Sequence, residues 1–406
     1  MEKDKVKDKI KIGMITDNFL PTRNGVAKVS DALTDALSRN DGVESIYLGC
    51  PSGFGDMQFN YKVVPCKATH LPIVGDGFSF VAFDRKYRKF IRETDVDVYH
   101  CQTISTLFSN ARKVAKKKHK PLIVTVHTLY HNDIKMYVKF NFLAKFVTKI
   151  VTHIFNKADE VWTLNAGVKD YLVNLGISAD KIRILNNGRN SKKVENLQER
   201  KQRFNEKYGI DSNMPVFCFV GRLFKYKNLF FILDSLIKLN RRGVDFRMFY
   251  CGSGGTDKKR LIKLIAKNGL QDKIKVISNV SDEDLTDIYT RSDLLLFPSF
   301  YDSDGIVKYE ASNCETPTLV VKGATASIGI EDGVSGFVAE NSPVLYADKI
   351  EQILSDRELL EKVGKQCSKY IVKSWDTIAE EAVELYKQAI ESYNKKHNII
   401  EEKICD

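Results

Sequence analysis

The stretch that decides the fold spans residues 297–317 and reads FPSFYDSDGIVKYEASNCETP. It begins at the end of an apolar run, passes through a polar turn that contains Gly305, and continues as a helix that carries Glu310. Asp302 lies in the turn, so its carboxylate can contact the front of a bound ligand. Glu310 lies further along the helix, so its carboxylate can contact a more distant pair of hydroxyls. Carboxylates suit sugar and ribose hydroxyls because each oxygen accepts from two donors. The stretch therefore predicts a strand, a turn and a helix that face a hydroxyl-rich ligand.

Short apolar runs alternate with longer amphipathic stretches along the rest of the chain. In the first half these runs are 10–15, 96–99, 122–126 and 160–163. In the second half they are 216–220, 246–250, 273–277, 294–297 and 318–321. Alternating strands and helices predict a parallel sheet covered by helices on both faces. Because the series restarts near residue 216, we expect two doubly wound α/β domains, which also suits a chain of 406 residues.

The boundary between the two series falls in a polar, charged segment. Residues 190–213 read as a surface helix and a linker, so we place the boundary near residue 195. The expected division is 1–195 for the first domain, 196–375 for the second, and 376–406 for a final helical segment. Within that segment, apolar residues recur at helical spacing between 376 and 394.

Two more loops follow expected strands. Residues 16–26 read TDNFLPTRNGV, and Gly25 lets backbone N–H groups approach a phosphate closely. On its own, this loop is typical of an ordinary turn. Residues 220–228 read VGRLFKYKN, in which Arg222 and Lys227 stand at the start of a helix and can clamp a diphosphate. Solvent-facing basic residues are the alternative for this second loop.

Together these motifs resemble the family-four retaining glycosyltransferases of the GT-B fold, over nearly the whole chain. The family's Glu-x7-Glu motif corresponds to Asp302 through Glu310, and its strand-GRL-x3-K motif to Gly221 through Lys227. The remaining matches are the first loop at Asn24-Gly25, a cleft histidine at His127, the Asn187-Gly188 pair, and the closing helix that begins at Trp375. The resemblance implies two facing Rossmann-like domains, with the C-terminal helix returning to the N-terminal domain.

The resemblance also implies which residues hold the donor. Arg222 and Lys227 would bind the diphosphate of a nucleotide sugar, and Glu310 would bind the ribose hydroxyls. Asn24 and Gly25 would present N–H groups to the phosphates. Preorganised cations and N–H groups would stabilise the departing diphosphate, so the resemblance implies neither a metal ion nor a cofactor.

The transferred sugar would be met by a second group of residues. The resemblance implies that Asp302, with the backbone of Gly305 and Ile306, faces the sugar, and that His127 contacts it near the reacting carbon. His127, Asp302 and Glu310 are thus the expected catalytic residues. Asp302-Ser303-Asp304 also reads as DxD, which holds a divalent metal in other transferases. Its place in the sugar-binding turn of a metal-independent family speaks against that interpretation.

This chain departs from the family pattern at three positions. The first acid of the motif is Asp302 instead of Glu, which is one methylene shorter. The usual Gly-Gly of the first loop is Gly25-Val26, and the usual Gly before Thr-Pro is Glu315.

The acceptor side of such enzymes is mainly the N-terminal domain, and there residues 135–157 read KMYVKFNFLAKFVTKIVTHIFNK. On a helical wheel, one third of the circumference holds Lys135, Lys139, Lys145, Lys149 and Lys157. The opposite face holds Met136, Leu143, Val147, Ile150, Val151 and Ile154, while Phe142 and Phe146 fall among the lysines. One interpretation is a core-packing helix with a solvated basic face. The other is an interfacial helix on an anionic membrane, with the apolar loop at 71–80 as a second insertion or as a lip of the acceptor site.

Charge and cysteine usage bear on partners and on location. The formal charge of +11 attracts phosphates, nucleic acid or anionic lipid, and it gathers in the N-terminal half, as in KVAKKKHK at 113–120. Eight cysteines stand singly, mostly in apolar runs, which is typical of buried thiols in a reducing cytosol. The N-terminus has no signal-peptide pattern, and no window is long and apolar enough for a membrane span. We therefore expect a cytoplasmic protein, peripheral on the inner face of the cell membrane, with no nucleic-acid partner.

These features resemble the diacylglycerol glucosyltransferases of bacteria most closely. The expected reaction moves a hexose from a donor such as UDP-glucose to a membrane lipid. A transferase that acts on a polysaccharide or lipid-linked oligosaccharide precursor is the alternative. A nucleotide-sugar epimerase would need further acid and base groups that we do not identify, and a non-enzymatic binding module would leave the donor motifs unexplained.

Overall fold

The chain divides into two compact units. The computed structural model describes residues 9–20, 25–51, 55–67, 69–70, 79–80, 84–131, 134, 138, 140–188, 194–252, 255–300, 302–371 and 373–398. The N-terminal unit comprises Met1–Gly188 and Lys373–Asp406, and the C-terminal unit comprises Arg189–Val372. The sequence analysis placed the corresponding boundaries near residues 195 and 375.

The N-terminal unit is built on a parallel sheet. Seven strands among the described residues pair in the order β3-β2-β1-β6-β7-β8-β9. Their bounds are β1 (Ile10–Ile15), β2 (Val43–Pro51), β3 (Lys62–Cys66), β6 (Val98–Cys101), β7 (Leu122–Val126), β8 (Glu160–Thr163) and β9 (Ile182–Ile184). A separate antiparallel pair joins β4 (Thr69–His70) and β5 (Ser79–Phe80). The helices are α1 (Gly25–Ser38), α2 (Arg85–Glu93), α3 (Thr106–Lys118), α5 (Asn141–Phe155), α6 (Ala166–Asn174) and α14 (Trp375–His397).

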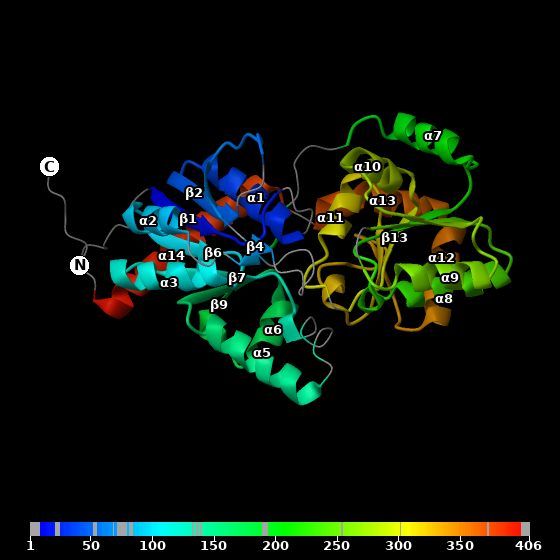
Figure 1. The fold of residues 1–406 in the computed structure, drawn as a ribbon. Helices are drawn as coiled ribbons and strands as arrows, with labels where there is room; N and C mark the ends of the chain where they lie inside the picture. The colour runs from blue at the N-terminus through cyan, green and yellow to red at the C-terminus, as the bar shows by residue number, and fades with distance from the viewer. Residues whose placement is uncertain are drawn as a thin grey trace. The chain divides into compact units, whose positions relative to one another are not determined.

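The central strands β1, β6, β7 and β8 are buried on both faces almost throughout, which explains their nearly continuous apolar sequences. In β7, Leu122, Val124 and Val126 belong to one core cluster, while Ile123 belongs to the other. The second cluster is completed by α14, whose Tyr386 is fully buried in it. Figure 1 shows this red helix running among the blue elements of the N-terminal unit. The predicted return of the C-terminal helix to the N-terminal domain is therefore confirmed.

The C-terminal unit repeats this architecture. Six strands among the described residues pair in parallel in the order β12-β11-β10-β13-β14-β15. Their bounds are β10 (Val216–Val220), β11 (Arg247–Cys251), β12 (Ile274–Ile277), β13 (Leu294–Phe297), β14 (Thr318–Val321) and β15 (Phe337–Ala339). The helices are α7 (Leu197–Tyr208), α8 (Leu229–Arg241), α9 (Lys258–Lys267), α10 (Asp282–Arg291), α11 (Ile306–Asn313), α12 (Pro343–Ser355) and α13 (Arg357–Ile371). Two parallel-sheet α/β domains, as predicted, are thus present.

Each sheet contains one point at which the order of its strands reverses. In the N-terminal unit this point lies between β1 and β6, and in the C-terminal unit between β10 and β13. Loops that follow two such strands leave in opposite directions and open a crevice at the carboxyl edge of the sheet, where ligands of open α/β sheets bind. The two loops that the sequence analysis emphasised follow β10 and β13, and the Gly25 loop follows β1.

Two further predictions concern the thiols and the membrane. The cysteines at 50, 66, 101, 218, 251, 314 and 367 are buried free thiols, and Cys405 lies outside the described residues. No helix within the described ranges is both long enough and apolar enough to cross a bilayer.

Candidate functional site

The loop after β10 places two cations around one tyrosine. Arg222 is exposed and donates a hydrogen bond to the hydroxyl of Tyr226 at 2.9 Å. The Nζ of Lys227 lies 5.3 Å from the centre of the same Tyr226 ring, which stacks on Phe224 at 5.5 Å between ring centres. Arg222 in turn lies over the Phe224 ring at 5.3 Å. The aromatic pair therefore holds both cations at the start of α8, as expected for a clamp on a doubly charged anion.

This loop packs closely on its neighbour. A Cβ atom on Gly252, which follows β11, would meet the carbonyl oxygen of Gly221 at 1.9 Å. The glycine at that position is therefore needed for the contact that supports the cationic loop.

The loop after β13 brings Asp302 to Lys227. The Lys227 ammonium and the Asp302 carboxylate form an ion pair, with side chains only 14% and 16% exposed. The second oxygen of Asp302, Oδ2, is buried and has no hydrogen-bond partner within the described part of the chain. Gly305 then adopts a left-handed backbone (φ 76°), where a Cβ would meet the Phe297 ring at 2.5 Å. The N-terminus of α11 begins at the next residue, Ile306, so Asp302, Gly305 and Ile306 do lie together at this turn.

The second acid of the DxD-like sequence, Asp304, has ionic and hydrogen-bond partners within the protein. Asp304 is 3% exposed, and Lys308, which is 1% exposed, lies 3.3 Å from its carboxylate. The hydroxyl of Tyr309 donates to the same carboxylate at 2.6 Å. Burial raises the pKa of Tyr309 well above its ordinary value, so the hydroxyl stays protonated. A carboxylate that is satisfied by a buried cation and a hydroxyl serves the local fold and is a poor ligand for a metal ion.

Glu310 lies further along α11. Its Oε2 accepts a hydrogen bond from the hydroxyl of Tyr289 at 3.1 Å, and Tyr289 is a buried residue of α10. The Glu310 side chain itself is only partly buried. The hydrogen bond from Tyr289 orients the carboxylate of this partly buried side chain.

The N-terminal unit contributes Gly25 and His127. Gly25 is exposed and is the first residue of α1, whereas Asn24 lies outside the described residues. His127 follows β7, and its Nε2 lies 2.7 Å from Oε1 of Gln102, which follows β6. Burial lowers the pKa of His127 to about 4, so the imidazole is neutral at pH 7.

Two further histidines have protein partners. His100 is fully buried between the hydroxyls of Tyr386 (2.5 Å) and Thr125 (2.6 Å). The Nδ1 of His131 lies 2.8 Å from Oγ1 of Thr148 on α5.

The sequence analysis did not single out Asp17, which follows β1 at the reversal point. Its side chain is 3% exposed. Burial raises its pKa to about 6, against the smaller opposing effects of Thr103 and Asn18. A buried carboxyl with a raised pKa at this edge of a sheet is a functional candidate. The sequence feature that could have identified Asp17 is a carboxylate directly after an apolar strand.

The structure corrects the predicted orientation of the 135–157 helix. The helix α5 covers only Asn141–Phe155, and Lys135, Lys139 and Met136 lie outside the described residues, as do positions 71–78 of the apolar loop. Its buried residues are Ala144, Thr148, Thr152 and Phe155. Leu143 and Ile150, which were expected to face the core, are instead 39% and 45% exposed. Val151 and Ile154 of the expected face do pack against the core. The packed face is therefore rotated from the predicted one toward Thr148, and Leu143 and Ile150 are left outside.

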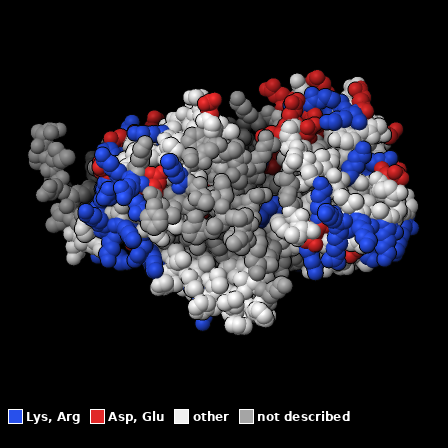
Figure 2. Space-filling model, viewed as in Figure 1, with Lys and Arg blue, Asp and Glu red and all other residues white. Residues whose placement is uncertain are grey.

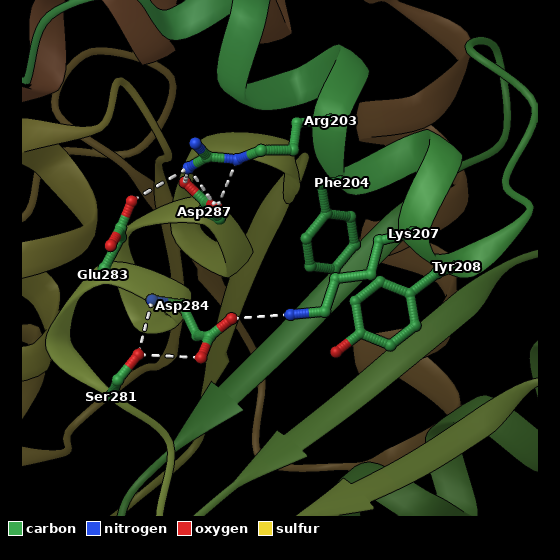
Figure 3. Close-up of a pocket in the computed structure, with 8 residues that line it drawn as sticks. All are labelled: Arg203, Phe204, Lys207, Tyr208, Ser281, Glu283, Asp284 and Asp287. Atoms are coloured by element: carbon green, nitrogen blue, oxygen red, sulfur yellow. Dashed lines mark hydrogen bonds and ion pairs between the residues drawn. The ribbon is translucent and has the colours of Figure 1, made fainter.

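A cavity of about 200 Å³ lies between α7 and α10 of the C-terminal unit (Figure 3). It is lined by Arg203, Phe204, Lys207, Tyr208, Ser281, Glu283, Asp284 and Asp287. The charges that face it are paired with one another: Arg203 with Asp287 at 2.6 Å and Lys207 with Asp284 at 2.7 Å. These pairs join the two helices, and none of the predicted site residues lines the cavity.

Asn187 and Gly188 are buried in the N-terminal unit. A Cβ on Gly188 would meet the Cα of Trp375 at 2.8 Å and its indole ring at 2.6 Å. The absence of a side chain at Gly188 therefore allows the first residue of α14 to pack against it.

Comparison with known proteins assigns both parts of the chain. Residues 23–193 match the family model described as Glycosyltransferase Family 4, and residues 200–370 match the model described as Glycosyl transferases group 1.

Full-length relatives agree with these two models. The chain is 26% identical over 404 residues to an uncharacterized glycosyltransferase of Methanocaldococcus jannaschii, covering 94% of this chain and 99% of the relative. It is 24% identical over 415 residues to the alpha-monoglucosyldiacylglycerol synthase of Acholeplasma laidlawii, covering 96% and 100%. The fold is similar to the crystal structure of HepE from Anabaena in complex with UDP and glucose. The TM-score is 0.72 at 15% identity, over 93% of this chain and 100% of HepE.

Proposed function

The chain belongs to the family-four glycosyltransferases of the GT-B fold, and from this premise we propose that its donor is a nucleotide sugar and its acceptor a membrane lipid. In detail, the enzyme moves a hexose from a donor such as UDP-glucose to a lipid such as diacylglycerol, retaining the anomeric configuration and using no metal ion. Arg222 and Lys227 bind the donor diphosphate, Asp302 and His127 meet the sugar, and Glu310 binds the ribose.

The main observation that supports a nucleotide-sugar donor is the cationic loop at the reversal point of the C-terminal sheet. Arg222 and Lys227 share Tyr226, and Lys227 also meets Asp302 from the neighbouring loop. A diphosphate bound there is next to a carboxylate that can accept from sugar hydroxyls. The complex of HepE with UDP and glucose supports a nucleotide-sugar donor by similarity of fold.

Metal-free transfer is supported by the partners of the acidic residues. A DxD metal site needs carboxylates that are available to the ion, yet Asp304 is committed to Lys308 and Tyr309. The departing diphosphate then has the two cations of the loop for charge stabilisation.

A lipid acceptor is supported by the outer face of α5. Phe142, Phe146 and Ile150 are spaced four residues apart and form one stripe, with exposures of 74%, 60% and 45%. Lys145 and Lys149 are exposed and flank the stripe. Exposed phenylalanines beside lysines are typical of helices that lie in the interface of an anionic membrane. Figure 2 shows the face over α5 as mostly uncharged surface.

A basic area on the same unit adds an electrostatic contribution. In Figure 2, Lys and Arg gather over α2 and α3. The exposed members of this area are Arg85, Lys89, Arg92, Lys113, Lys116 and Lys117. Each basic residue near an anionic leaflet contributes about 1 kcal/mol, screened by salt within a Debye length. The apolar stripe and the basic area together favour an anionic lipid surface over a soluble glycan.

The transfer reaction tests the proposal. Purified protein is incubated with a panel of nucleotide sugars and with vesicles that contain diacylglycerol and anionic lipid, and the lipids are analysed by mass spectrometry. We expect one donor to yield a lipid that carries a single added hexose with the anomeric configuration of the donor. Hexose on a soluble oligosaccharide but not on lipid would contradict the lipid acceptor. Inverted configuration would contradict the retaining mechanism.

Vesicle co-sedimentation tests the membrane surface separately. Because the two rings are already partly buried, Phe142→Ser with Phe146→Ser should lose about 2–4 kcal/mol of binding at every salt concentration. Lys145→Glu with Lys149→Glu should lose only the salt-sensitive part. The matched control is Val344→Ser with Leu345→Ser, which changes two exposed apolar residues of α12 in the other unit. Equal binding of the wild type to neutral and anionic vesicles, or loss of binding in the control alone, would refute the α5 surface.

A further inference from the structure

A buried polar cluster lies behind His127 at the carboxyl ends of three adjacent strands. Met14 belongs to β1 and pairs in register with His100 of β6, while Thr125 belongs to β7. Gln102 follows β6 and is anchored by its backbone N–H to the carbonyl of Ile15 at 2.8 Å. Gln102 is 1% exposed, and both Met14 and His100 are fully buried. The cluster is therefore shielded from bulk water.

The sulfur of Met14 determines which way the amide of Gln102 points. Gln102 Nε2 lies 3.0 Å from Met14 Sδ. A thioether only accepts hydrogen bonds, so the amide nitrogen must face it and the amide oxygen must point the other way. That oxygen, Oε1, lies 2.7 Å from Nε2 of His127.

This orientation determines the tautomer of His127. An amide oxygen only accepts, so the hydrogen bond requires a proton on Nε2 of the imidazole. Burial lowers the pKa of His127 to about 4, so at neutral pH the ring carries one proton. Nδ1 is then the nitrogen with the lone pair, and it accepts but does not donate.

The outer side of the cluster is held by the C-terminal helix. Tyr386 of α14 contacts Nδ1 of His100 at 2.5 Å, and Thr125 contacts Nε2 of the same ring at 2.6 Å. The Trp162 ring packs against His100 and Tyr386, with ring centres 4.8 Å apart in both pairs. His100 is thus held on both nitrogens, and its Nε2 lies 3.4 Å from Nε2 of Gln102.

We propose that Gln102 is the positioning residue of His127: it holds the ring in the Nε2–H tautomer, in which Nδ1 accepts but does not donate. A neutral ring in this tautomer does not protonate a leaving oxygen from Nδ1. The kinetic consequence, which requires His127 to lie at the sugar, rests on the proposed function, whereas the tautomer does not.

The tautomer is tested by nuclear magnetic resonance on the full chain labelled with ¹⁵N-histidine. The nitrogen shifts of a neutral imidazole distinguish Nε2–H from Nδ1–H, and the His127 signals are assigned by their loss in His127→Asn. We expect Nε2–H in the wild type and loss of this preference in Gln102→Met, which removes the amide at similar volume. An Nδ1–H tautomer in the wild type overturns the inference even if the variant does not fold.

Kinetics test the positioning role. We expect Gln102→Met to lower kcat by about tenfold or more, with little change in the donor KM, because the ring is misplaced while the diphosphate clamp is intact. The control is Gln202→Met, the same change on the exposed face of α7, which should leave kcat and tautomer unchanged. A lost tautomer preference with unchanged kcat would show that His127 is not at the reacting sugar. That result would contradict the proposed function and leave the tautomer assignment standing.

Discussion

The buried carboxyl of Asp17 gives the N-terminal unit a measurable pH dependence. Its pKa lies at about 6 in the folded protein, against an ordinary value of 3.8. The folded state therefore binds more protons than the unfolded state between these values, and stability falls as the pH rises through this window. At 1.36 kcal/mol per pKa unit, the carboxylate costs about 3 kcal/mol above pH 6. Asp17→Asn keeps the shape but stays neutral.

We therefore expect Asp17→Asn to gain about 3 kcal/mol relative to the wild type between pH 3.5 and pH 7. Both tryptophans of the chain, Trp162 and Trp375, lie in the N-terminal unit, so their fluorescence follows unfolding of that unit in urea. Other titrating groups are common to both proteins and cancel in the difference. A difference in unfolding free energy that stays constant across this pH range would refute a buried, strained carboxyl at Asp17.

Three more predictions follow from single features. Glu315 has a left-handed backbone (φ 60°) and an exposed side chain, so Glu315→Gly should stabilise the C-terminal unit by about 0.5–1 kcal/mol in calorimetry, whereas Glu315→Ala should not. Gly188→Ala should destabilise the N-terminal unit by about 1–3 kcal/mol, because its Cβ would overlap Trp375; unchanged fluorescence-detected unfolding would contradict that packing. Transfer activity should survive exhaustive EDTA treatment, and activity that returned only with Mg²⁺ or Mn²⁺ would establish a metal requirement.

Much of the fold could be predicted from the apolar runs of the sequence. The runs 10–15, 122–126, 160–163, 216–220, 294–297 and 318–321 coincide with strands, because fully buried parallel strands are continuous and apolar. The strands β9 and β15 span three residues each, too few for a pattern to stand out. β2 was missed because its first residues, Val43, Glu44 and Ser45, are partly polar and exposed.

The sequence predicted the candidate site only where the functional residues lie close together in one motif. The cationic loop and the Asp302 turn each lie within one motif, and the strand order then brings Lys227 to Asp302. The partners of Asp304 were not predicted, because burial of Lys308 depends on how α11 packs. Leu143 and Ile150 of α5 were misassigned because the wheel treats large apolar residues as core, whereas the packed face is centred on the smaller Ala144 and Thr148.

The most direct test of the account is turnover of the preferred nucleotide sugar by Arg222→Ala and Lys227→Ala, singly and together. Each cation should contribute about 2–4 kcal/mol to transition-state stabilisation, so each single variant should lose roughly 30-fold to 1000-fold in kcat/KM. The matched control is Lys225→Ala, which removes an exposed lysine from the same short turn. The account predicts near wild-type turnover in the control and near abolition in the double variant. Wild-type turnover in the double variant would contradict a diphosphate clamp at this loop.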